Sequence, residues 1–224
     1  MVGEPTLLQR IAQHICIISI LVILLGCQST YYAAMEKVGV HKRDILVERV
    51  EEARDTQVET KEQFQSALTA FSSLTNFDGG ELEDKYTELS KVLERSEEKA
   101  DELHERIEAI EDVSAALFRE WEAELEQYSS TNLRRSSAQQ LELTRERYRQ
   151  LIEAMRRAES KIEPVLQPLR DQVLYLKHNL NARAVAALRH ELKDIRTDVS
   201  SLVGELEEAV AEADRFITSM EQDS

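Results

Sequence analysis

The histidines are the first residues to consider for chemistry, because helical proteins can hold iron between their helices. A di-iron site of that kind needs Glu-x-x-His pairs, since positions i and i+3 direct both ligands to one metal. In this chain only Asp101 and His104 approach that spacing, and no second pair occurs. Leu103 and Ile107 belong to an apolar stripe, which predicts that His104 lies beside the helix core. We expect no metal site and no cofactor.

Nucleophilic catalysis and phosphate binding have no better candidates. The sequence contains no Gly-x-Ser-x-Gly elbow, and Gly79-Gly80 is not followed by the Lys-Ser or Lys-Thr of a phosphate loop. An enzyme that cleaves envelope polymers would need paired carboxylates in a cleft, which a regular helical bundle does not offer. We therefore expect no catalytic residues and no enzymatic activity.

The thiol of Cys27 has the clearest chemical setting. It follows an apolar run at residues 15–25, and Arg10 supplies a positive charge ahead of that run. About 11 apolar residues match the core of a signal peptide and are short for a membrane span. The segment Leu24-Leu25-Gly26-Cys27 resembles the lipobox of bacterial lipoproteins.

This resemblance implies that residues 1–26 are removed and that Cys27 carries the lipid anchor. Gln28 follows where Asp would signal retention, which favours the outer membrane over the inner membrane. The alternative is an uncleaved signal anchor, because no charged residue lies between Arg10 and Glu36. In both cases the mature chain is expected to face the periplasm. If Cys27 is lipidated, its two or three acyl chains would provide stable anchoring.

Composition and charge indicate a helical protein and exclude several partners. The chain has 224 residues with 6 Gly and 3 Pro, and 32% of the residues are charged, which is typical of long helices. Its net charge of −15 predicts repulsion from nucleic acids and from anionic lipid surfaces. Both cysteines, Cys16 and Cys27, lie in the apolar N-terminal region, so the mature domain has no disulfide.

Beyond Tyr31, apolar residues recur at alternating steps of three and four, the seam of a coiled coil or bundle. The first seam contains Gln57 and Thr60, which either fix the register or mark a place where the helix separates from its neighbours. The second seam runs to Tyr128. The third runs from Leu141 through Val173 to Leu180, and the last runs from Val185 to Met220. After a linker at residues 27–41, we predict one bundle domain, residues 42–224, with helices at about residues 42–75, 81–129, 137–179 and 182–221.

The helix boundaries rest on caps, turns and prolines. The segment Asn76-Phe77-Asp78-Gly79-Gly80 predicts a turn, and Ser137 with Gln140 predicts a capping box. Pro164 and Pro168 predict a kink or a local break in a bent helix, not a domain boundary. Asn181 is the expected N-cap of the last helix, although residues 178–181 contain neither Gly nor Pro, which leaves open whether a true turn occurs there.

Charge distribution favours an elongated, antiparallel, up-down-up-down bundle of four helices. Residues 81–130 contain 17 acidic and 6 basic residues, whereas residues 134–180 contain 6 acidic and 10 basic residues. The acidic run at Glu97-Glu98 is expected to be solvated. The basic pairs Arg134-Arg135 and Arg156-Arg157 either contact the acidic helix or meet an acidic partner.

Three segments carry a resemblance to a known family: Cys27 to Gly39, Asn76 to Gly80, and Val173 to Ala182. They resemble the bacterial domain-of-unknown-function family 2959, across essentially all of the mature chain. The resemblance implies a coiled-coil-rich fold and a lipoprotein-type N-terminus. It implies no activity and no site residues.

These observations lead to an expected function as a membrane-anchored envelope lipoprotein. We expect a non-enzymatic scaffold that binds an envelope protein or its own copies, and no nucleic acid. The alternative is a ligand- or cation-binding module with a site inside the bundle near Pro164 and Pro168. The polar loop at residues 177–181 is either a partner-binding tip or an ordinary capped turn.

Overall fold

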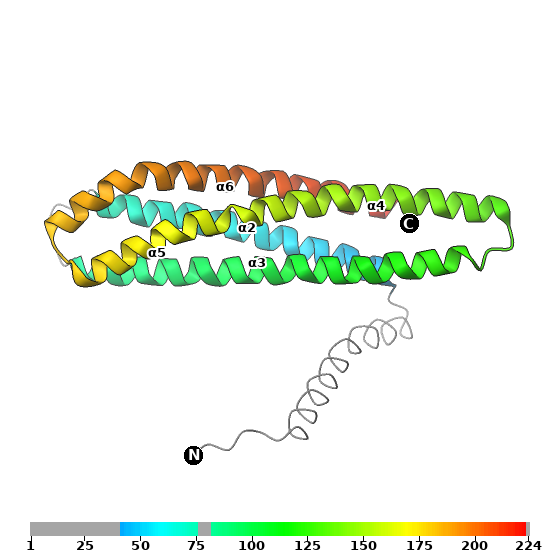
Figure 1. Ribbon diagram of the computed structural model, residues 1–224, viewed down its shortest axis with the longest axis horizontal. Coiled ribbons are helices and arrows are strands. Elements are labelled where there is room, and N and C mark those ends of the chain that lie inside the picture. The colour runs from blue at the N-terminus through cyan, green and yellow to red at the C-terminus, as the bar shows by residue number, and fades with distance from the viewer. Residues whose placement is uncertain (1–40, 76–81, 223–224) are drawn as a thin grey trace, which may run out of the picture. The chain divides into compact units, whose positions relative to one another are not determined.

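The computed structural model describes residues 41–75 and 82–222, and all regular secondary structure within these residues is α-helical. The helices, in chain order, are α2 (Lys42–Thr75), α3 (Leu82–Leu125), α4 (Thr131–Ser160), α5 (Ile162–His178) and α6 (Ala182–Gln222) (Figure 1). The predicted all-α class is confirmed for this part of the chain. Several predictions lie outside the described residues: the signal peptide, Cys27, linker residues 27–40 and the turn at residues 76–80.

Residues Leu46–Ser224 form one packed unit, and its interior follows the predicted seam. On α2, every predicted seam residue is at most 2% exposed; these residues are Leu46, Val50, Ala53, Gln57, Thr60, Phe64, Ala67, Phe71 and Leu74. The predicted seam of α6 is buried along its whole length as well. Burying one large apolar side chain stabilises a fold by roughly 1.5–3 kcal/mol, so these seams hold the helices together.

Ion pairs between helices show which helices are neighbours and in which direction they run. Along α2 the residue numbers rise while those of the partners on α3 fall, from the Glu52–Arg106 pair to the Glu59–Lys99 pair. The two helices are therefore antiparallel (Figure 1). The same order holds for α4 and α5 against α3 and for α2 against α6, in the pairs Arg145–Glu122, Arg156–Glu111, Arg170–Glu97, Arg54–Asp214 and Lys61–Glu207.

The predicted proline kink takes the form of a break at Lys161, between α4 and α5. Pro164 has no amide hydrogen, so it cannot donate to the carbonyl of Ser160, and the regular hydrogen-bond ladder is interrupted there. The amide of Lys161 instead donates to the carbonyls of Ala158 and Glu159. Pro168 lies inside α5, which runs at an angle to α4 (Figure 1).

The predicted capping box at Ser137 is wrong, because α4 begins at Thr131. Ser130 occupies the N-cap, and its side chain accepts a hydrogen bond from the Leu133 amide at 3.4 Å. Ser137 lies inside α4, where its hydroxyl accepts a hydrogen bond of 2.8 Å from Trp121 Nε1. Residues 129–132, Ser-Ser-Thr-Asn, offer several possible caps ahead of Ser137, and Ser130 takes that role.

A true turn separates α5 from α6. Asn179 leaves the helical conformation with φ of −136° and ψ of 60°, and its side-chain amide donates to the Tyr175 carbonyl at 2.9 Å. The Asn181 carbonyl accepts the Val185 amide at 3.4 Å, which is the first hydrogen bond of α6. Asn181 therefore has the backbone position expected of an N-cap.

Candidate functional site

The most connected polar cluster surrounds His104, where α3 faces the end of α4. Its Nδ1 lies 2.5 Å from Glu159 Oε1, and its Nε2 lies 3.2 Å from Glu108 Oε1. Glu159 also accepts a hydrogen bond of 2.7 Å from Arg156, which in turn pairs with Glu111 on α3. Both ring nitrogens of His104 therefore face carboxylates of this chain.

The electrostatics of this cluster favour the charged forms of its members. The hydrogen bond with Glu159 raises the pKa of His104 above its ordinary value. Burial alone would raise the pKa of the Glu159 carboxyl, but hydrogen bonds from Arg156 and His104 outweigh burial and leave that pKa below its ordinary value. The arrangement is that of an ion-pair network joining two helices, and not of two groups that exchange a proton.

A groove of about 360 Å³ lies beside the cluster, between α3 and the α4–α5 break. We call it the His104 groove, and its lining residues are Glu97, Ala100, Asp101, His104, Glu159, Ile162, Glu163, Leu166 and Arg170. The structure thus places both members of the Asp101–His104 pair on one groove. Across residues 41–75 and 82–222, no group of three or more His, Cys, Asp and Glu side chains is arranged to hold a metal ion.

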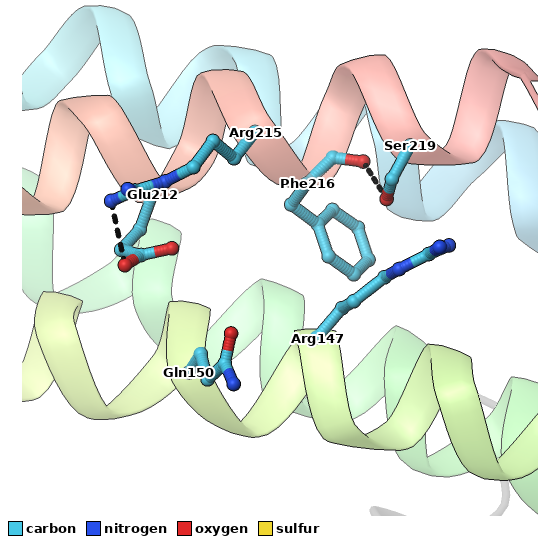
Figure 2. Close-up of a pocket in the computed structure, with 6 residues that line it drawn as sticks. All are labelled: Arg147, Gln150, Glu212, Arg215, Phe216 and Ser219. Carbon is cyan, nitrogen blue, oxygen red and sulfur yellow. Dashed lines mark hydrogen bonds and ion pairs between the residues drawn. The ribbon is translucent and has the colours of Figure 1, made fainter.

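A second groove, of about 250 Å³, lies between α4 and α6 (Figure 2). Arg147 and Arg215 both line it, but Figure 2 shows their guanidinium groups extending toward opposite ends of the groove. Arg215 pairs with Glu212 at 2.6 Å, and the Ser219 hydroxyl donates a hydrogen bond of 2.8 Å to the Phe216 carbonyl. The two arginines therefore do not converge on one anion.

A third groove, of about 400 Å³, lies between α5 and α6. We call it the α5–α6 groove, and it is lined by Pro168, Asp171, Gln172, Tyr175, Leu188 and Glu191. Gln172 is 6% exposed, and its amide nitrogen has no hydrogen-bond partner. The seam pattern placed Val173 in the core, but the structure buries Gln172 instead and leaves Val173 half-buried.

That difference has a simple origin in the spacing. The steps from Leu169 to Leu176 satisfy the three-and-four rhythm through either residue 172 or residue 173. The apolar side chain of Val173 made it the natural choice from sequence. The equally regular steps from Leu169 to 172 and from 172 to Leu176 were the only sign in the sequence that Gln172 could be buried.

The predicted polar seam residues of α2 lie in the interior. Gln57 is 0% exposed, and neither its amide nitrogen nor its amide oxygen has a partner. Thr60, also fully buried, donates to the Thr56 carbonyl of its own helix at 2.7 Å. Gln63 connects two helices, because its amide donates to the Val92 carbonyl at 3.2 Å and to Ser96 Oγ at 3.1 Å.

Most of the predicted basic residues have intramolecular partners. Arg156 pairs with Glu111 on the acidic α3, and Arg134 pairs at 2.5 Å with Glu126, the residue that follows α3. Both pairs agree with the intramolecular interpretation of these two arginines. Arg157 pairs instead with Glu208 on α6, at 2.9 Å. On the acidic side, Glu97 pairs with Arg170 at 2.6 Å, a contact that sequence reasoning missed.

The predicted polar loop ends α5 and precedes α6. His178 is exposed, and Leu180 is 42% exposed although it closed the third predicted seam. Tyr128, which lies just after the C-terminal end of α3, is likewise 42% exposed, although the second predicted seam placed it in the core. Both apolar side chains lie beside the turns that join two helices.

Comparison with known proteins identifies a family and no individual relative. No curated protein and no solved structure matches the chain. None of the described helices combines the length and the apolar character needed to cross a membrane. The family match covers residues 31–220, which includes all the grooves and the His104 cluster. The chain therefore belongs to the family described as Protein of unknown function (DUF2959).

Proposed function

We propose that this protein is a lipid-anchored, non-enzymatic scaffold of the bacterial cell envelope. Cys27, at the end of the lipobox-like segment, would carry the lipid, and residues 27–41 would link it to the helices. The mature chain would face the periplasm, with the outer membrane favoured by Gln28. Its partner would be another envelope protein or further copies of the chain.

In this proposal, the part of the protein that binds the partner is an elongated four-helix, up-down-up-down bundle. The falling order of ion-pair partners between α2 and α3, and between α3 and α4, supports this arrangement. The break at Lys161 divides the third rod of the bundle into α4 and α5. A bundle of this kind presents fixed side chains at known spacings, which suits a scaffold.

The observation that carries this proposal is that five of the six exposed large apolar side chains within residues 41–75 and 82–222 flank a turn, while the sixth, Leu143, lies within α4. Tyr128 and Leu133 flank the α3–α4 turn, with 42% and 59% exposed. Leu174, Tyr175 and Leu180 flank the α5–α6 turn, with 60%, 42% and 42% exposed. Apolar side chains gathered on a strongly acidic chain mark surfaces that suit protein contacts.

The test is in-cell crosslinking and affinity capture of the lipidated protein, read by mass spectrometry, with Cys27→Ala as the unanchored control. The proposal expects one specific envelope protein, or the chain itself, and expects its loss in the control. His104→Ala and His178→Ala should leave the capture unchanged. Capture of no protein in either form would contradict the scaffold function.

A second candidate function is binding of a small ligand or cation near the α4–α5 break. The His104 groove favours this candidate, because it brings the carboxylate of Asp101 to one concave surface beside Ile162 and Leu166, where Glu97 and Glu163 pair with Arg170. Equilibrium dialysis against divalent cations, with native mass spectrometry of the purified protein, tests it. Detection of no bound species at millimolar cation would contradict this candidate and leave the scaffold proposal intact.

A further inference from the structure

We propose that the α5–α6 groove is the docking site for a protein partner, and that the docking segment places a large apolar side chain next to Lys or Arg. This inference rests on the proposed scaffold function and names its contact surface. Three independent features of the groove carry it: an apolar floor, a buried amide without an acceptor, and two carboxylates without a cation.

The apolar floor gives the groove its capacity for a side chain. Leu188 is 4% exposed at its base, Pro168 is half-buried, and the ring of Tyr175 remains 42% exposed. The volume of about 400 Å³ is within the range of ordinary binding pockets. Leu174, directly beside Tyr175 in sequence, is 60% exposed and extends the apolar surface beyond the groove.

The buried amide supplies a hydrogen-bond donor with no acceptor of its own. Gln172 is 6% exposed, and its Nε2 has no hydrogen-bond partner among the residues that the structure describes. Buried polar groups in native proteins are almost always hydrogen-bonded, so an orphaned donor on a groove requires an explanation. A backbone carbonyl of a bound segment would be a suitable acceptor, once the partner has excluded water from the groove.

The carboxylates determine the charge of the partner. Asp171 stands on α5 and Glu191 on α6, and neither forms an ion pair within residues 41–75 and 82–222. Asp171 accepts a hydrogen bond of 3.2 Å from the Gln167 side-chain amide. The adjacent Arg170, by contrast, pairs with both Glu97 and Glu163.

Two carboxylates on opposite walls attract a cationic group and repel anionic lipids and nucleic acids. The apolar floor between them is a poor site for a hydrated metal ion, which prefers oxygen ligands on every side. A polypeptide segment satisfies all three features at once. It brings an apolar side chain, a backbone carbonyl and a neighbouring Lys or Arg.

The experiment places the photocrosslinking residue benzoylphenylalanine at Tyr175 of the full lipidated chain in cells. Tyr128 is the matched control position, because it is also 42% exposed but flanks the α3–α4 turn. We expect the Tyr175 variant to crosslink one envelope protein. The crosslinked peptide, sequenced by mass spectrometry, should contain a large apolar residue next to Lys or Arg.

Charge variants in the same background test the carboxylates. The double variant Asp171→Lys/Glu191→Lys should lower the crosslinking yield by about tenfold. Glu94→Lys/Glu98→Lys makes the same change in net charge on the exposed side of α3 and should leave the yield unchanged. The neutral variant Asp171→Asn/Glu191→Gln should give an intermediate yield, and it keeps the test decisive if the lysine variant folds poorly.

Several outcomes would overturn the inference. Equal yields for the two lysine variants, a crosslinked peptide without Lys or Arg, or a crosslink to another copy of this chain would each do so. A partner crosslinked from position 128 and not from position 175 would remove the docking site while the scaffold function stands. Absence of crosslinks from both positions removes the docking site as well, and the whole-protein capture described above then decides the scaffold function separately.

Discussion

Gln57 is the position at which a single substitution should make this protein more stable. Its side chain is fully buried in α2, and both polar atoms of its amide lack partners. Gln57→Met keeps the length and unbranched shape of the side chain while removing both polar atoms. Burying an amide without a hydrogen bond costs about 1–3 kcal/mol in proteins, so the free energy of unfolding should rise by roughly that amount.

Urea denaturation followed by far-UV circular dichroism measures this change. For a chain of this size, each kcal/mol should also raise the melting temperature by about 2–4 °C. Gln63→Met is the matched control on the same helix, because the Gln63 amide donates to the Val92 carbonyl and to Ser96 Oγ. Losing these bonds should lower the free energy of unfolding by about 1 kcal/mol. The two substitutions are chemically identical and should have opposite signs.

An unchanged or lower urea midpoint for Gln57→Met, with an unchanged slope m, would refute this reasoning. That result would mean that the buried amide has a partner after all, such as an internal water molecule with its own hydrogen bonds. A change in m would instead indicate a change in the surface exposed on unfolding. The control separates these cases, because Gln63→Met should lose stability in each of them.

Three further predictions concern charge, the α3–α4 turn and the anchor. The hydrogen bond with Glu159 raises the pKa of His104, so protonated His104 stabilises the folded state. This contribution to the free energy of unfolding is complete below the unfolded pKa of 6.5 and is lost as the pH rises through the higher folded pKa. His104→Ala should therefore lower the free energy of unfolding at pH 5.5, measured by urea denaturation, by about 0.5 kcal/mol or less after solvent screening, and leave it unchanged at pH 9. Trp121→Phe removes the hydrogen bond to Ser137 and should speed amide hydrogen exchange near the α3–α4 turn; unchanged exchange would contradict a role for this bond. Cys27→Ala should move the protein from the detergent phase to the aqueous phase in detergent partitioning, and retention in the detergent phase would support the uncleaved signal anchor.

Helical periodicity in the sequence predicted most of the buried face of each helix, and on α5 it chose Val173 where the structure buries Gln172. On α2 it correctly placed even Gln57 and Thr60 in the interior, because helical periodicity assigns a face regardless of residue polarity. Periodicity does not show where the neighbouring helices end. The second seam was predicted to continue to Tyr128, which is exposed.

The ends of the helices explain that difference. Arg157 pairs with Glu208, and antiparallel continuation from this pair places Gln222, the last residue of α6, level with about residue 143 of α4. The part of the α3–α4 hairpin nearest its turn therefore extends beyond α6. Leu133, on that part of α4, is 59% exposed for the same reason.

Individual contacts between helices were harder to predict from the sequence than the buried face of each helix. The pairing of His104 with Glu159, and of Gln63 with Ser96, depends on the axial position of one helix against another. No local pattern contains that information. The charge distribution predicted only the broader result, that the basic α4–α5 segment contacts the acidic α3.

Two departures from regular packing lie at the same level of the packed unit. Gln57 lies between Glu52 and Glu59, whose partners on α3 are Arg106 and Lys99, so it is level with residues 99–106 of α3. His104 belongs to that stretch, and it pairs with Glu159, two residues before the break at Lys161. The unpartnered amide and the interrupted helix therefore coincide.

The break also determines where grooves form. It allows α5 to diverge from α4, and α5 then contributes lining residues to both the His104 groove and the α5–α6 groove. The groove between α4 and α6 has a different character, because its Arg215 is paired with Glu212 and its arginines extend apart (Figure 2). Pro164 and Pro168 thus weaken the helix ladder, but they place α5 so that Gln172, Asp171 and Tyr175 share one concave surface. A straight helix in the place of α4 and α5 would be expected to pack more regularly and to lose that surface, which is why α5 is the segment on which the proposed partner contact depends.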